Sequence, residues 1–161
     1  MGRGENIYLV PGWDSFLHFY AGIMSAILGY HLAGLFAIHC KNERVLNIIF
    51  AICLALSIAL VWEFFEYGMD RLFNQDMQVD TIIHSITSYT LGEETGVLGY
   101  IPQIDSVLVN GSELVDGGYL DIGLIDTMTD TLMGALGAVV AVIAMAIDNG
   151  RHPLIRSTRT A

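Results

Sequence analysis

Basic residues are scarce in this chain. Its 161 residues include 7 Lys and Arg against 17 Asp and Glu, which gives a formal net charge of −10 at pH 7. No basic patch interleaved with aromatic residues is present, so the sequence argues against nucleic-acid binding. A phosphate-binding glycine loop and a Ser/His/Asp hydrolase pattern are also missing, which removes two common classes of soluble enzyme from consideration.

Cysteine is rare as well, and the chain shows no sign of being divided into separate units. Cys40 falls in a short polar connection and Cys53 in the middle of an apolar run, so we interpret them as free thiols rather than a disulfide framework. There is no internal repeat, low-complexity tract or Gly/Ser linker. A single membrane domain over residues 1–161, with an insertion at about 68–119, is the simplest organisation.

What the sequence does contain is apolar. Hydrophobic residues make up 53% of the chain and charged residues only 15%. Three apolar stretches, at about 16–38, 45–67 and 120–147, reach the roughly 20 residues that a helix needs to cross a bilayer. The first follows a polar lead without a basic n-region, which does not fit a cleaved signal peptide. We therefore predict an all-α membrane protein with three transmembrane helices, in contact with the lipid bilayer.

The few basic residues predict the orientation in the membrane. Five of the seven lie in the connection after the first span and in the C-terminal tail (Lys41, Arg44, Arg151, Arg156 and Arg159), whereas only Arg71 lies between the second and third spans. The positive-inside rule places the first connection and the C-terminus in the cytoplasm. The N-terminus and residues 68–119 are then expected outside.

The outer segment at 68–119 is too long for a plain loop, so we expect it to have structure of its own. Asn110-Gly111 lies between β-rich residues and is the strongest short hairpin signal in the chain. The stretch "DTIIHSITSY" fits either a short interfacial helix or a strand. Eight of the 17 acidic residues lie in this segment, where a solvated outer surface is the ordinary interpretation.

Six polar residues lie in the outer turns of the three spans, at helical spacings that bring them onto inward faces: Asp14, His18, Glu63, Glu66, Asp126 and Asp130. Carboxylates exposed to lipid would cost several kcal/mol each, so they should face the bundle interior. Gly22 and Gly134 continue two of these faces and favour close helix packing. Trp62 is expected in the interfacial aromatic belt.

No Lys or Arg lies within a span to neutralise these acids. They must hold a cation, be largely protonated or hydrogen-bonded, or form a pathway for protons or ions. Carboxylates with one imidazole suit a divalent metal ion such as Mg²⁺, Mn²⁺, Ca²⁺, Fe²⁺ or Zn²⁺. We therefore predict a divalent metal site formed by these six residues.

Three motifs resemble a known family. The stretches "WDSFLHFYAG", "WEFFEYGMDRLF" with the following "DMQVDT", and "GYLDIGLIDTMTDTLMGALGA" are similar to those of YjdF-like bacterial integral membrane proteins, whose function is uncharacterised. The resemblance runs from about Ile7 to Ile147, and the family pattern falls on the same six residues. A more distant similarity connects the chain to VanZ-like proteins. The resemblance also implies further helices ahead of this region, so the chain is expected to be a fragment, a short paralogue, or part of a homo-oligomer or a complex that supplies them.

Two classes of function follow from these predictions. In the first, the chain is an enzyme whose metal activates water or polarises a phosphoryl or carbonyl oxygen of a lipid-linked or cell-envelope substrate. Asp130 or Glu66 would then be the catalytic base. In the second, the chain is a non-enzymatic protein whose carboxylate cluster binds an ion for transport, sensing or assembly, or has a structural or proton-coupled role.

Overall fold

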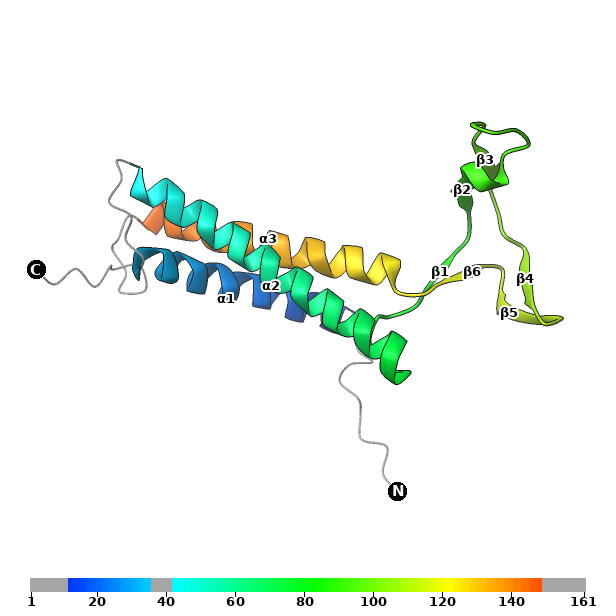
Figure 1. Ribbon diagram of the computed structural model, residues 1–161, viewed down its shortest axis with the longest axis horizontal. Coiled ribbons are helices and arrows are strands. Elements are labelled where there is room, and N and C mark those ends of the chain that lie inside the picture. Colours follow the sequence, from blue (N-terminus) through cyan, green and yellow to red (C-terminus); the bar gives the residue numbers. More distant parts are fainter. Residues whose placement is uncertain (1–11, 36–41, 149–161) are drawn as a thin grey trace, which may run out of the picture.

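The computed structural model describes residues 12–35 and 42–148 and consists of three long helices with a small β-rich cap at one end (Figure 1). The helices are α1 (Trp13–Leu35), α2 (Glu43–Phe73) and α3 (Leu124–Asp148). Each is long and apolar enough to cross a membrane. The predicted all-α membrane fold with three transmembrane helices is confirmed, and the chain is a multi-pass membrane protein.

The helix boundaries differ from the predicted ones where local chemistry sets them. Helix α2 continues past the predicted end at residue 67 and stops at Asn74, which adopts a left-handed conformation with φ 52°. Helix α3 starts at Leu124 rather than residue 120, because Tyr119–Asp121 forms a strand. Gly123, with φ 87°, turns the chain into the helix. Residues 36–38 of the predicted first span lie outside the described residues.

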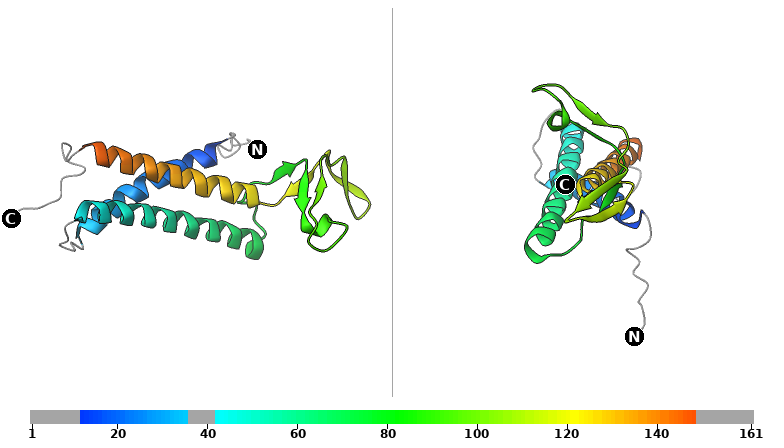
Figure 2. Two further views of the ribbon diagram at one scale, coloured as in Figure 1. Left: turned by 90° about the horizontal axis from the view of Figure 1, so that it is seen from above. Right: turned by 90° about the vertical axis from the view of Figure 1, so that its right-hand side faces the viewer.

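The cap consists of antiparallel strand pairs and is richer in strands than the single predicted hairpin. It contains β1 (Thr81–Ile83), β2 (Ile86–Ser88), β3 (Gly99–Ile101), β4 (Ser106–Val109), β5 (Ser112–Asp116) and β6 (Tyr119–Asp121), with a 3₁₀ turn, η2, at Tyr89–Leu91. Strand β1 pairs with β6, β2 with β3, and β4 with β5. The cap projects from the end of the bundle where α2 ends and α3 begins (Figure 2).

Local turn chemistry explains the cap's hairpin. The predicted Asn110-Gly111 turn joins β4 to β5, and both residues have positive φ, 52° and 83°, as a tight hairpin turn requires. The "DTIIHSITSY" stretch, for which the sequence allowed a helix or a strand, supplies β1 and β2. The pairing of β1 with β6 brings the two chain segments that enter and leave the cap together beside the membrane helices.

The helices approach closely through small residues. A Cβ added at Gly22 of α1 would stand 2.0 Å from the carbonyl oxygen of Gly134 in α3, and one at Gly137 would stand 2.0 Å from that of Phe19. Alanines dominate the buried apolar core, among them Ala26, Ala51, Ala55 and Ala138. The predicted small-residue faces therefore form the seam between α1 and α3, as is typical of membrane helices.

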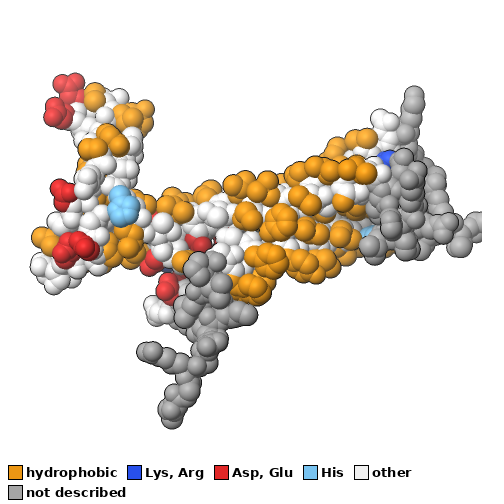
Figure 3. Space-filling view, turned by 180° about the vertical axis from the view of Figure 1, so that it is seen from behind, with side chains coloured by type: hydrophobic (Ala, Val, Ile, Leu, Met, Phe, Trp, Pro, Cys, Tyr) orange, Lys and Arg blue, Asp and Glu red, His pale blue; other side chains and the backbone are white. Residues whose placement is uncertain are grey.

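Large hydrophobic side chains cover the outside of the bundle. Large apolar side chains are exposed on all three helices, and they are spread along the face of the bundle that Figure 3 shows. Only 11% of the most apolar 18-residue stretch of α2 is buried. Surfaces of this kind are stable against hydrocarbon rather than water, so the helices contact the lipid bilayer.

Arg44, at the start of α2, contacts the C-terminus of α3 at the end of the bundle opposite the cap. Its Nη2 donates hydrogen bonds to the carbonyl oxygens of Met145 (3.2 Å) and Ala146 (2.6 Å) in the last turn of α3. A guanidinium at a helix C-terminus satisfies carbonyls that lack helical partners and opposes the negative end of the helix dipole. The other basic residues that predicted the orientation, Lys41 and those of the C-terminal tail, lie outside the described residues.

Candidate metal centre

His18 lies between carboxylates from all three helices, at the cap end of the bundle. Its Nε2 is 3.8 Å from Asp14 Oδ1 and 3.8 Å from Asp130 Oδ2, while its Nδ1 is 3.5 Å from Glu63 Oε1. Glu66 lies one turn beyond Glu63 on the same buried face of α2. We call these five residues the acid–histidine cluster.

Apart from partly exposed Asp14, the cluster is buried, and it is incompletely hydrogen-bonded. The exposed fraction is 0% for Asp130, 2% for Glu63 and 3% for Glu66. Four of their buried oxygens have no hydrogen-bond partner: both oxygens of Glu63, Oε2 of Glu66 and Oδ2 of Asp130. Since buried carboxylate oxygens are costly when unsatisfied, this arrangement calls for a proton, a water or a cation among them.

Two hydrogen bonds to the cluster come from side chains that sequence reasoning did not assign to it. Ser15 Oγ donates to Asp130 Oδ1 at 2.9 Å, and Trp62 Nε1 donates to Glu66 Oε1 at 2.7 Å. The separation of four residues between Trp62 and Glu66 was a usable signal, because such residues are neighbours on one helix face. No sequence signal linked Ser15 to Asp130, 115 residues away.

Asp126 and Asp70 hold the connector between α2 and β1, which we define as residues 74–80. Asp70 accepts hydrogen bonds from the backbone N–H groups of Met77 (2.7 Å, Oδ1) and Gln78 (3.0 Å, Oδ2). Asp126 Oδ2 accepts one from the N–H of Val79 at 2.8 Å. These two acids therefore fix the connector to the turns of α2 and α3 nearest the cap.

The side chain of Gln78 attaches the connector to the start of α3. It is buried and donates a hydrogen bond from Nε2 to the hydroxyl of Thr127. It also packs over Gly123: a Cβ added to Gly123 would stand 2.7 Å from the Cβ of Gln78. Gly123 is therefore needed for close approach as well as for its backbone conformation. Sequence reasoning did not identify Gln78, because a single polar residue in a loop carries no periodic signal.

Acidic side chains outside the spans gather on the cap and where the cap meets the helices (Figure 3). Desolvation and the neighbouring carboxylates, Asp76 foremost and then Asp121 and Asp70, raise the pKa of Asp80 above its ordinary value. His84 has its Nδ1 2.7 Å from the carbonyl oxygen of Gly117 and lies away from the cluster, on an exposed part of the cap. These residues form a polar surface rather than an extension of the buried cluster.

The cluster contains two groups of three residues whose geometry can hold a metal ion. One consists of Asp14, His18 and Asp130, and the other of His18, Glu63 and Glu66; in each, the potential ligand atoms lie within 4.8 Å of one another. Only small side-chain adjustments would bring such atoms to bonds of about 2.1 Å. Five of the six residues predicted from the sequence thus lie together, whereas Asp126 belongs to neither group. Their action as ligands stays a prediction.

Comparison with known proteins gives one family. The family described as "Predicted membrane protein (DUF2238)" matches residues 5–151, which contain every described helix and strand. No curated protein and no solved structure matches the chain.

Proposed function

The chain belongs to the predicted membrane protein family DUF2238, and we propose that it binds a divalent cation within the membrane at the acid–histidine cluster. This family is that of the YjdF-like proteins, so the resemblance found in the sequence is confirmed. The similarity to VanZ-like proteins has no further support and carries no part of the proposal. Family membership supplies the membrane location, and the chemistry comes from the cluster itself.

The observation that carries the proposal is the set of four buried carboxylate oxygens without hydrogen-bond partners around one imidazole. Three of the four belong to Glu63, which faces Nδ1 of His18, and to Glu66, which can share an ion with both. Asp130, on the Nε2 side, already accepts a hydrogen bond from Ser15. We therefore place the ion between His18, Glu63 and Glu66.

Charge supports a cation over a closed structural cluster. The described residues contain two arginines: Arg44 contacts the far end of α3, and exposed Arg71 lies over the ring of Tyr67. Within the cluster, a protonated His18 would supply at most one positive charge against several carboxylates. A divalent ion supplies two charges and converts unsatisfied oxygens into ligands.

The remaining acids would support the ligands. An imidazole that binds a metal through one ring nitrogen normally directs the other toward a carboxylate, which fixes the ring and raises its basicity. Asp130 and Asp14 face Nε2 and fill that role when the ion lies on the Nδ1 side. One imidazole and two glutamates are a ligand set that suits Zn²⁺, Mn²⁺ or Fe²⁺.

We further propose that the cluster faces the extracytoplasmic side. Arg44 lies at the opposite end of the bundle from the cap, and the positive-inside rule assigns that end to the cytoplasm. An ion held there would be available for a metal-dependent reaction on a lipid-linked substrate in the outer leaflet, with Asp130 or Glu66 as the base. Ion binding for transport or assembly, in a homo-oligomer or with partner helices, is the alternative.

Elemental analysis by inductively coupled plasma mass spectrometry tests the ion directly. Protein purified in detergent without chelators is expected to contain one divalent metal per chain. Glu63→Gln should remove it, because it takes away the charged ligand at nearly unchanged volume. Asp130→Asn should weaken metal affinity about 10–100-fold without abolishing it, as is usual for groups that orient a ligand.

Matched controls are Glu94→Gln and Asp116→Asn, which make the same chemical changes at exposed positions of the outer segment. Both should keep the metal content of the unmodified protein. If the purified protein contains no metal and Glu63→Gln is as stable as the original protein, the ion proposal is wrong. The cluster would then consist of protonated acids. Equal metal loss in the cluster and control variants would show that the acids bind ions only nonspecifically.

A further inference from the structure

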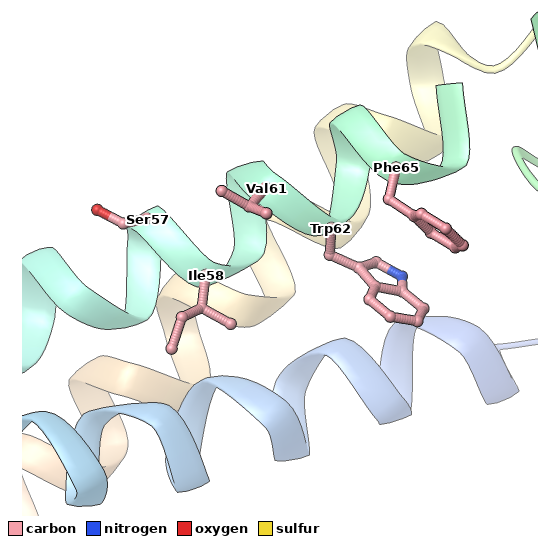
Figure 4. Close-up of a pocket in the computed structure, with 5 residues that line it drawn as sticks. All are labelled: Ser57, Ile58, Val61, Trp62 and Phe65. Carbon is pink, nitrogen blue, oxygen red and sulfur yellow. The ribbon is translucent and has the colours of Figure 1, made fainter. Parts of the chain in front are cut away.

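An apolar groove of about 510 Å³ runs along the outer half of α2. It is lined by Ser57, Ile58, Val61, Trp62 and Phe65. Figure 4 shows the side chains of Ile58, Trp62 and Phe65 projecting from α2 toward the side on which α1 runs. Its volume falls within the range of small-molecule sites.

The position of the groove specifies the chemistry of its occupant. Its lining residues all belong to one apolar span and cover about two helical turns, or about 12 Å along the axis. Val61 is 66% exposed and Trp62 49% exposed, so the groove opens to the surface of the bundle that contacts lipid. In a medium of hydrocarbon, an apolar groove along a helix matches an extended chain and offers nothing to a polar ligand.

Trp62 connects this groove to the acid–histidine cluster. Its ring lines the groove, while its Nε1 donates the hydrogen bond to Glu66. Glu66 is almost fully buried, so the indole contacts both the groove and one of the buried acids. A molecule in the groove therefore has its outer end beside the cluster.

We infer that the groove binds one hydrocarbon chain of a lipid, whose polar end lies beside the acid–histidine cluster. The placement of the polar end rests on the proposed ion, whereas chain binding rests on the groove alone. A second copy of this chain is a poorer fit, because a helix with side chains is about 10 Å wide and requires a much larger contact than five residues of one helix provide.

Trp62 itself can report on the occupant, because bromine atoms quench tryptophan fluorescence on contact. The chain has two tryptophans, so a Trp13→Phe background leaves Trp62 as the sole tryptophan, which is excited selectively over the tyrosines at the red edge of its absorption. The probe is dibrominated stearic acid, added at low mole fraction to the protein in detergent. We expect quenching that saturates, with the fully bound state reached well before the probe becomes a major part of the micelle.

Val61→Phe narrows the groove, and Val140→Phe makes the same change at a lipid-exposed position of α3. In the Trp13→Phe background, Val61→Phe should weaken the saturable quenching at least fivefold and Val140→Phe less than twofold. Both should keep the metal content and the thermal stability of the background protein. Quenching that rises linearly with probe, equally in both variants, would overturn the inference whatever the metal content.

Two further outcomes separate this inference from the proposed function. Saturable quenching in protein that holds no metal would keep the chain site and overturn the placement of the polar end beside an ion. A change in oligomeric state caused by Val61→Phe, measured by mass photometry in detergent, would assign the groove to a second copy of the chain and overturn the lipid assignment.

Discussion

Replacing Gly22 by alanine tests whether the seam between α1 and α3 holds the acid–histidine cluster together. The added Cβ would stand 2.0 Å from the carbonyl oxygen of Gly134, while ordinary contact begins at 3.4 Å. The obstacle is backbone, so the helices must separate by about 1.4 Å. Overpacking of this kind costs roughly 1–3 kcal/mol.

The same displacement should reach the cluster, because His18 lies one helical turn before Gly22 on α1. The distance between His18 Nε2 and Asp130 Oδ2, now 3.8 Å, would increase to about 5 Å if α3 stays in place. Loss of a carboxylate that orients a ligand lowers metal affinity about 10–100-fold. Gly22→Ala should therefore reduce both the thermal stability and the metal affinity of the protein.

Gly134→Ala is the matched control for this change. A Cβ there would find its nearest neighbours at 3.5 Å, the Ala59 Cβ, and at 3.7 Å, the His18 carbonyl oxygen, which are ordinary contacts. Thermal unfolding in detergent and metal titration of both variants measure the two effects. Equal behaviour of Gly22→Ala and Gly134→Ala would refute the reasoning, because the two substitutions differ only in the space available to the methyl group.

Two other substitutions test the hydrogen bonds around the cluster. Trp62→Phe removes the donor to Glu66 and leaves a further buried oxygen unpaired, which should cost about 1–3 kcal/mol in chemical unfolding, whereas Trp13→Phe should cost little. Asp70→Ala removes two acceptors of connector N–H groups, so hydrogen exchange at residues 77–78 should accelerate at least tenfold; exposed Asp76→Ala should leave it unchanged. Unchanged exchange in Asp70→Ala would show that the connector is held by other contacts.

Much of the fold follows from the sequence because its causes are local. Three apolar runs long enough to span a bilayer predict three helices, whatever the helices then pack against. The cost of exposing carboxylates to lipid directs Glu63, Glu66 and Asp130 inward. The Asn110-Gly111 hairpin follows from the backbone preferences of two residues. Each of these predictions is confirmed by the structure.

What the tertiary structure decided concerns contacts between distant segments. The spacing of the acids could not separate Asp126, which accepts a hydrogen bond from Val79, from Asp130, which faces His18. The link between Ser15 and Asp130 and the pairing of β1 with β6 depend on how whole helices and strands meet. Helical periodicity tells which face of a span is polar. The identity of the group opposite that face depends on the crossing of the helices, and no local pattern encodes it.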